Sequence, residues 1–438
     1  MLVGFPLWWV LGLNTFIFPI AAVVMLVQLL RMRRVRPMRF PPAFWIWALY
    51  LVWMLLGLAM FDSSPAGTHS GSLTGRLISI GFDVMVYLTM TITVLYIGNL
   101  PLVSVPREAI GRWMGWLFLT VAAGGFLGIL APRLSFPSLL ELFLPHGLVA
   151  NDFVKTLVHP SAAQVQQVIG EDNGRPSAPF GYTNSWANVL GIVLLWFVAA
   201  WVIPARGRRR WMYAAIAAVT FVPIVLSLNR GLWIGVIFTV VWLAIRQLAF
   251  GRIGVLLTGI AAVLIGATVI LVSPLHSVID ARLQNGKSND IRAFVGSYSI
   301  KGADESPIIG YGGTRHINGS SSSIAVGPSA KCSSCGDFAT GSTGLLWSVM
   351  FNNGYGGLTI YFGFFLFSLW VYRRERGAIN EAALATIALL FVYSWFYSAV
   401  PAAPTLTIIA LCVLWRSRLE RQSVTISHRV ALEPAGDH

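Results

Sequence analysis

Charged residues are scarce in this sequence, and their scarcity excludes an ordinary soluble protein. Only 11% of the 438 residues are Asp, Glu, Lys or Arg, whereas 56% are apolar. A soluble globule of this length could not bury so much apolar surface, so we expect the lipid bilayer to be its solvent. Acidic residues are scarcer than basic ones, 17 against 31. The net charge of +14 would suggest nucleic acid for a soluble protein, but here the loops that carry it must be considered first.

The sequence also lacks a recognisable cleavable signal peptide. Residues 5–30 are apolar, but this run is longer than the hydrophobic region of a signal peptide, and its positive charges follow it instead of preceding it. We therefore interpret 5–30 as a retained helix.

What the sequence does have is a series of long apolar runs, most of them near the ~20 residues that a spanning helix needs. These runs are 5–30, 40–61, 77–101, 112–131, 186–203, 211–226, 232–249, 253–273, 354–372, 382–400 and 404–415. A further run, 342–353, is too short to span and is expected to be a half-helix that leads into the next span. The sequence thus predicts an all-α polytopic membrane protein with about eleven transmembrane helices.

The loops between these runs alternate in charge. The short basic loops are 31–39, 106–112, 204–210, 246–252, 373–377 and 415–422. The positive-inside rule places them in the cytoplasm, with the N-terminus outside and the C-terminus inside. We therefore expect a multi-pass protein of the cytoplasmic (inner or plasma) membrane. Because an outside N-terminus that begins almost within a helix is unusual, one further helix missing upstream is an alternative.

This topology divides the chain into six parts. They are the N-terminal transmembrane helices (1–131), an extracytoplasmic loop (132–185), transmembrane helices with the SLNRG segment (186–273), a large extracytoplasmic loop and half-helix (274–353), the C-terminal transmembrane helices (354–417) and a cytoplasmic tail (418–438).

The two long outer loops are too long and too mixed in charge to be simple connections. The loop 274–341 contains basic and acidic residues together, which suits a folded cap better than a tail. We expect this cap to lean on the loop 132–185. Its GYGG segment (310–313) lacks the length and the following lysine of a P-loop, so nucleotide binding is rejected there. Cys332 and Cys335 lie in the same loop, and an oxidising outer compartment favours a disulfide between them. A zinc site would need two more ligands, for which only His316 is an obvious neighbour.

One arginine stands at the join of two apolar runs, in the segment LSLNRGLWIG (226–235). No acidic residue of this segment could pair with Arg230. It is either an interfacial anchor that extends to the membrane surface, or a ligand for an anionic substrate.

Four segments resemble the O-antigen ligase-like membrane glycosyltransferases, in the family's order and over roughly 175–375. SLNRGLWIG is similar to the family's S-x-S-R-G segment, and FGYTNSWANVLG (180–191) to the aromatic, Asn-containing entry of an earlier helix. SNDIRAF followed by SPIIGYGG (288–313) resembles the opening of the large periplasmic loop. STGLLWSVMFNNGYGG (342–357) resembles the last motif, H-N-x-x-L…G-x-x-G.

The resemblance implies transfer of a glycan from a polyprenyl-pyrophosphate carrier to an acceptor hydroxyl of a glycolipid or another glycan, on the outer face of the membrane. It implies no nucleotide sugar, no cofactor and no required metal. Guanidinium groups must then stabilise the pyrophosphate leaving group, because arginine stays charged and binds phosphate oxygens in pairs. Arg230 and Arg292 carry over by match to this role. For Arg292, an ion pair with Asp290 is the alternative.

The sequence departs from the family at its histidine, because Thr343 and Gly344 stand where that residue is expected. His316, in the same loop, is the candidate substitute for the base that accepts the proton of the acceptor hydroxyl, since histidine titrates near neutral pH. An ordinary loop histidine is the alternative.

Four other residues are assigned to substrate binding. Asn229 precedes Arg230, and Tyr182 and Asn184 lie at the entry of the span 186–203, where helix capping or an aromatic interface belt is the alternative. Asp83 is an acid within the span 77–101. It could pair with an outer arginine and orient it, or form a hydrogen bond to a neighbouring helix.

Other functions stay open at this point. A polysaccharide polymerase of the same superfamily would share these motifs. A transporter or flippase would be expected to have charges near the bilayer midplane, discontinuous helices and an internal repeat, and we find no convincing repeat. A non-catalytic envelope protein would tolerate replacement of Arg230.

Overall fold

The computed structural model describes residues 1–150, 152–167, 172–249, 251, 277, 279–280, 287–318, 338–398 and 400–432. Its helices are α1 (Phe5–Val10), α2 (Ile17–Arg33), α3 (Phe44–Gly57), η1 (Leu58–Met60), α4 (Leu73–Asn99), α5 (Arg107–Leu130), α6 (Leu139–Phe143), α7 (His146–Val149), α8 (Asp152–Val158), α9 (Thr183–Phe197), η2 (Val198–Val202), α10 (Gly207–Val219), α11 (Phe221–Leu226), α12 (Arg230–Ala249), α15 (Lys287–Glu305), α17 (Leu345–Tyr372), α18 (Ala378–Tyr393) and α19 (Ala402–Leu432). The strands are β1 (Thr68–His69), β2 (Ala163–Gln167), β3 (Asp172–Pro176) and β4 (His316–Ile317).

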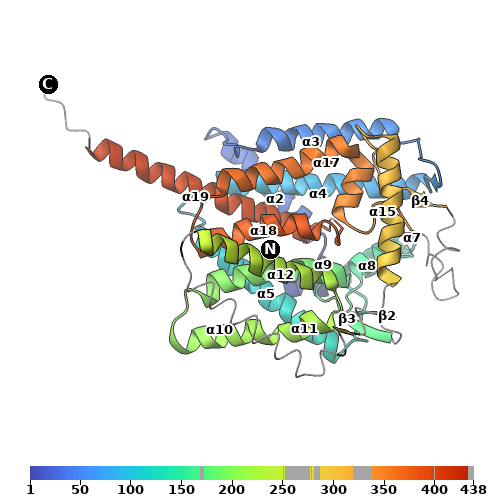
Figure 1. Cartoon of the computed structure of the whole chain (residues 1–438), viewed down its shortest axis with the longest axis horizontal. Helices are drawn as coiled ribbons and strands as arrows, with labels where there is room; N and C mark the ends of the chain where they lie inside the picture. The colour runs from blue at the N-terminus through green and yellow to red at the C-terminus, as the bar shows by residue number, and fades with distance from the viewer. Residues whose placement is uncertain are drawn as a thin grey trace.

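Seven helices of the described residues are long and apolar enough to cross a membrane. They are Leu73–Asn99, Arg107–Leu130, Thr183–Val202, Gly207–Leu226, Arg230–Ala249, Leu345–Tyr372 and Ala402–Gln422. Most long helices run along the same axis of the molecule (Figure 1). By length and composition, therefore, the chain is a helical, multi-pass membrane protein, which confirms the coarse prediction from the sequence.

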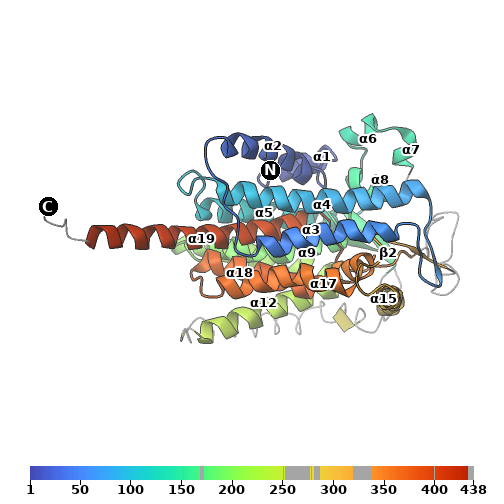
Figure 2. The same ribbon diagram turned by 90° about the horizontal axis from the view of Figure 1, so that it is seen from above.

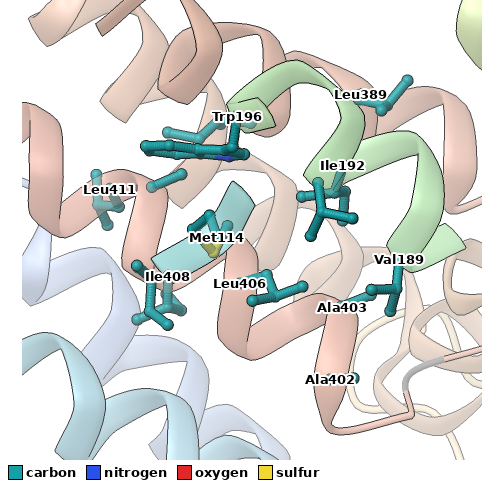
Figure 3. Close-up of a cluster of buried hydrophobic side chains, with 14 of the residues drawn as sticks. Met114, Val189, Ile192, Trp196, Leu389, Ala402, Ala403, Leu406, Ile408 and Leu411 are labelled. Atoms are coloured by element: carbon teal, nitrogen blue, oxygen red, sulfur yellow. The ribbon is translucent and has the colours of Figure 1, made fainter. Parts of the chain in front are cut away.

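The core of the bundle forms around α19. Within the most apolar 18-residue window of its span Ala402–Gln422, 89% of the residues are buried, the largest share among the seven candidate spans. Figure 3 shows Leu406, Ile408 and Leu411 of this helix beside Met114 and Trp196. The indole of Trp196 donates to Thr386 Oγ1 at 3.0 Å, so the polar atom of this large side chain has an acceptor in the core.

The first apolar run is not a single helix, so the expectation for 5–30 was wrong. It forms α1 and α2, separated by a turn in which Gly12 has φ +76°. Asn14, in the same turn, is buried and donates to the carbonyl of Pro179 at 3.0 Å. The chain bends here because this turn packs against the outer loop near Ser138, which a side chain at Gly12 would overlap.

The half-helix expected over 342–353 is present. It joins the following span as α17, and Gly354 interrupts the helix with φ +65° and ψ −175°. Such dihedral angles are essentially limited to glycine. A Cβ at Gly354 would lie 2.6 Å from the carbonyl oxygen of Pro307, so the break is also a point of close backbone approach.

Other expected boundaries shift. The run 382–400 was placed too late, because α18 begins at Ala378 and ends at Tyr393. The tail predicted over 418–438 begins within α19, which stays helical to Leu432, and its cytoplasmic position stays a prediction. The expected span 253–273 lies outside the described residues.

The two long loops 132–185 and 274–341 contain secondary structure of their own at one end of the bundle. The loop 132–185 forms α6, α7, α8 and the antiparallel pair β2–β3, in which Ala163 pairs with Pro176. In the loop 274–341, α15 lies across that end of the bundle, opposite the end from which α19 projects (Figures 1 and 2). The short antiparallel pair β1–β4 joins this loop to the segment between α3 and α4.

Candidate functional site

Asn229 positions the first residue of α12. Its side-chain oxygen accepts a hydrogen bond from the backbone N–H of Leu232 at 3.3 Å, as an N-cap residue does. Leu228, just before it, has φ +54°, which is unusual for a non-glycine residue and turns the chain sharply into the helix. The segment SLNRG therefore places Arg230 at the very start of α12, at the end of the bundle where α15 lies.

Polar side chains of two other elements bond to Asn229, which is itself only 4% exposed. Its Nδ2 donates to Asn184 Oδ1 at 2.9 Å, and the hydroxyl of Tyr397 donates to its Oδ1 at 2.7 Å. These bonds join α9, α12 and the turn between α18 and α19. The network fixes the three elements relative to one another on the side of the bundle from which Arg230 begins.

Arg292 of α15 lies close to Arg230. Its guanidinium is 5.5 Å from the centre of the Phe396 ring, in a cation–π arrangement. Burial lowers the pKa of Arg292, and the positive charge of Arg230 lowers it further. Arg230 itself donates to Asn289 Oδ1 at 2.7 Å, so it contacts α15 one turn before Arg292. The structure thus brings together the two arginines that the sequence singled out.

A third arginine, which sequence reasoning missed, lies beside this network. Arg175 of β3 donates through Nε to the carbonyl of Ser227 at 2.8 Å, and its own carbonyl accepts from the Thr183 hydroxyl at 3.2 Å. Burial raises the pKa of Tyr397, and the positive charges of Arg292 and Arg175 act in the opposite direction. The signal for Arg175 was its place in an outer loop just before the FGYTN segment. We call Arg175, Arg230 and Arg292 the arginine group.

Neither Thr183 nor Asn184 caps α9, which corrects the alternative raised for this helix entry. Tyr182 occupies the N-cap position, and the cap has no side-chain hydrogen bond. Asn184 is joined to Asn229 instead. The assignment of Tyr182 to substrate binding stays a prediction.

His316 lies in another environment. It belongs to β4, and its ring stacks on that of His69 with centroids 5.4 Å apart. His69 in turn is joined to Asn318 at 2.6 Å through Nδ1. These neighbours belong to the β1–β4 pair and not to the arginine group, so the structure gives His316 no added support as the base.

Thr343 stands where the resemblance would place a histidine, and the residues on both sides of it contact the turn that carries Tyr397. Its neighbour Leu345 donates from the backbone N–H to the carbonyl of Tyr397 at 2.8 Å, and Ser398 donates to the carbonyl of Ser342 at 2.8 Å. The segment 342–345 is therefore docked on the turn that carries Tyr397.

Asp83 forms a hydrogen bond to a neighbouring helix, which is the second of the two alternatives raised for it. It accepts from Asn352 Nδ2 of α17 at 3.4 Å. Both residues line a pocket between α4 and α17. Its assignment to substrate binding stays a prediction.

Of the three cysteines, the structure describes only Cys412. Cys332 and Cys335, with the disulfide expected between them, lie outside the described residues. Cys412 is a buried free cysteine of α19. In the described part of the chain, no group of three or more His, Cys, Asp or Glu is arranged to hold a metal ion.

Comparison with known proteins found no matching family model, and no curated protein or solved structure showed significant similarity.

Proposed function

We propose that this protein is an O-antigen ligase-like transferase of the cytoplasmic membrane. It would move a glycan from a polyprenyl-pyrophosphate carrier to an acceptor hydroxyl, for the assembly of a cell-envelope polysaccharide. The proposal includes about eleven spans, with the end that carries α15 on the outer side. It rests on the four ordered segments of the sequence and on the arginine group.

The observation that carries the proposal is the approach of Arg292 to Arg230. Like charges repel, so two guanidinium groups held near each other by separate elements gain most when an anion lies between them. A pyrophosphate suits this position because its oxygens accept paired hydrogen bonds from planar guanidinium groups. Its negative charge grows as the glycosidic bond breaks, so the same contacts would strengthen in the transition state. The acceptor proton would go to a base, for which His316 stays the candidate from the sequence.

Binding of a polyprenyl pyrophosphate by the purified protein in lipid tests the proposal. We expect Arg230→Ala and Arg292→Ala each to weaken binding by roughly tenfold or more, since a charge-assisted hydrogen bond contributes about 1.5–3 kcal/mol. Arg230→Lys and Arg292→Lys should retain part of the affinity, because lysine keeps the charge and loses the paired geometry.

Arg133→Ala is the matched control, because Arg133 is an exposed arginine of the outer loop 132–185. It should bind as the unchanged protein does. Equal affinity in all these variants would remove the basis of the proposal. Binding that depends on the two arginines, followed by glycan transfer to an added acceptor, would support it, and the acceptor used would distinguish a ligase from a polymerase.

One structural observation favours a transporter as the second candidate. The break of α17 at Gly354 beside Asp83 combines a discontinuous helix with a carboxyl group inside a span, as transporters often do. Movement of a labelled lipid-linked glycan across vesicles, without transfer to an acceptor, would favour this candidate over the transferase.

A further inference from the structure

A small pocket with mixed polar and apolar walls lies between α3, α4 and α17, apart from the arginine group. Its lining includes Asp83, Tyr87, Asn352, Asn353 and the backbone of Gly312. Among the described residues that line it, Asp83 is the only one with a charged side chain. A carboxylate in a membrane-spanning helix is costly unless a partner compensates its charge.

Two oxygens in this lining have no hydrogen-bond partner. Asn352 is 6% exposed and Asn353 is 2% exposed, yet the side-chain oxygen of each is buried and accepts nothing. Their amide groups are oriented by other bonds. Asn352 Nδ2 donates to Asp83 and to Ser348 Oγ, each at 3.4 Å, and Asn353 Nδ2 donates to the hydroxyl of Tyr50 at 3.3 Å. A buried acceptor without a donor costs free energy, so the unpaired side-chain oxygens of two residues that line one pocket are available as ligands.

The break in α17 places a third group with negative character at the pocket. The half-helix Leu345–Asn353 ends at Gly354, so its carbonyl end, which carries partial negative charge, lies at the pocket. Carbonyls at the ends of broken membrane helices are known ligands of small cations. The carbonyls of Phe351, Asn352 and Asn353 at this helix end already accept hydrogen bonds from Tyr311, Gly312 and Trp53. Asp83 and the two amide oxygens are therefore the groups that favour a positive charge.

We propose that this pocket binds a single small hard cation through oxygen ligands from Asp83, Asn352 and Asn353. Carboxylate, amide and carbonyl oxygens suit such ions, and one carboxylate balances one positive charge, so the sodium ion is the natural probe. The site is separate from the proposed transferase activity and does not depend on it.

The cation would hold the segment that follows α15 in place. Gly312 donates its backbone N–H to the carbonyl of Asn352 at 2.8 Å, and Tyr311 donates to the carbonyl of Phe351 at 3.1 Å. The GYGG segment is thus joined to the end of the half-helix. An ion that fixes Asn352 and Asn353 against Asp83 therefore stabilises the junction of α4, α17 and the segment 310–313.

The test measures binding of radioactive sodium by the purified full chain and its melting temperature in sodium chloride against choline chloride at equal ionic strength. We expect saturable sodium binding and a rise in melting temperature of roughly 3–6 °C at saturation. Asp83→Asn keeps the shape of the side chain and removes its charge, and it should abolish both effects.

Asp62→Asn is the matched control, because Asp62 is an exposed acid of the segment between α3 and α4 that lies 3.6 Å from Arg76. It should leave sodium binding unchanged. If Asp83→Asn does not fold, saturable binding by the unchanged protein that Asn353→Ala weakens at least tenfold still supports the site. Absence of saturable binding of sodium, lithium or potassium by the unchanged protein overturns the proposal.

Discussion

At the scale of single residues, the structure distinguishes a buried structural arginine, Arg315, from the arginines proposed to bind an anion, Arg230 and Arg292. The sequence alone does not make this distinction. Arg315 is 1% exposed and donates to the carbonyls of Met60, Phe61, Ser63, Tyr311, Gly313 and Thr314. It joins the GYGG segment to the end of η1 and the residues that follow it. Arg230 and Arg292, in contrast, approach each other. In the sequence all three are arginines of outer segments, so only the acceptors around them distinguish a structural role from a binding role.

Arg315→Met should destabilise the protein by about 3 kcal/mol or more, because several buried carbonyls would lose a charged donor at once. The melting temperature in lipid or detergent measures this. Arg374→Met, at an exposed position of the loop between α17 and α18, is the control and should change it little. An Arg315→Met protein as stable as the control would show that these hydrogen bonds are not needed.

At the scale of elements, the sequence predicted most long helices and one of two interruptions, the half-helix before Gly354, but not the break between α1 and α2. The apolar period and length of the run 112–131 were enough to predict α5, which spans Arg107–Leu130. The break between α1 and α2 could not be predicted, because it depends on contacts of Gly12 and Asn14 with segments that are more than a hundred residues away. The half-helix before Gly354 was predicted because its run was too short to span.

Two glycines of α17 should respond oppositely to alanine. Gly354→Ala places a Cβ where the dihedral angles are unfavourable and the Pro307 carbonyl is 2.6 Å away, so we expect destabilisation of about 1–3 kcal/mol. Gly363 has no atom within 4 Å of its Cβ position. Gly363→Ala should therefore be neutral or stabilise by up to about 1 kcal/mol. Melting temperatures of the two variants measure the difference, and equal effects would show that α17 does not depend on its break.

At the scale of the whole molecule, the alternation of basic and long loops predicted which segments share an end of the bundle. The segments α6, α8 and α15 lie at one end, and α19 projects from the other (Figures 1 and 2). The site was predicted in part. Matching segments pointed to Arg230 and Arg292, whereas Arg175, Tyr397 and the asparagine pair became evident only from contacts between distant helices. The positions of Cys332 and Cys335 stay predictions.

Orientation in the membrane can be tested by labelling single cysteines in right-side-out vesicles. Val35 is 82% exposed and lies in a basic loop, and Phe143 is 79% exposed and lies on α6. With Cys332 and Cys335 replaced by serine, Phe143→Cys should react with an impermeant maleimide in intact vesicles, and Val35→Cys only after permeabilisation. The reverse pattern would invert the proposed topology.

The burial of α19 also has a consequence for biogenesis. The ribosome makes this helix after the helices α4, α5, α9, α17 and α18 that it packs against, so the centre of the bundle stays open until α19 has been made. Arg416 of α19 donates to the carbonyls of Ile97, Leu100 and Val105. These carbonyls have no such donor until more than three hundred further residues have been synthesised. A ribosome that stops after α18 would leave in the membrane a nascent chain whose helices surround an unfilled groove, open to chaperones and proteases.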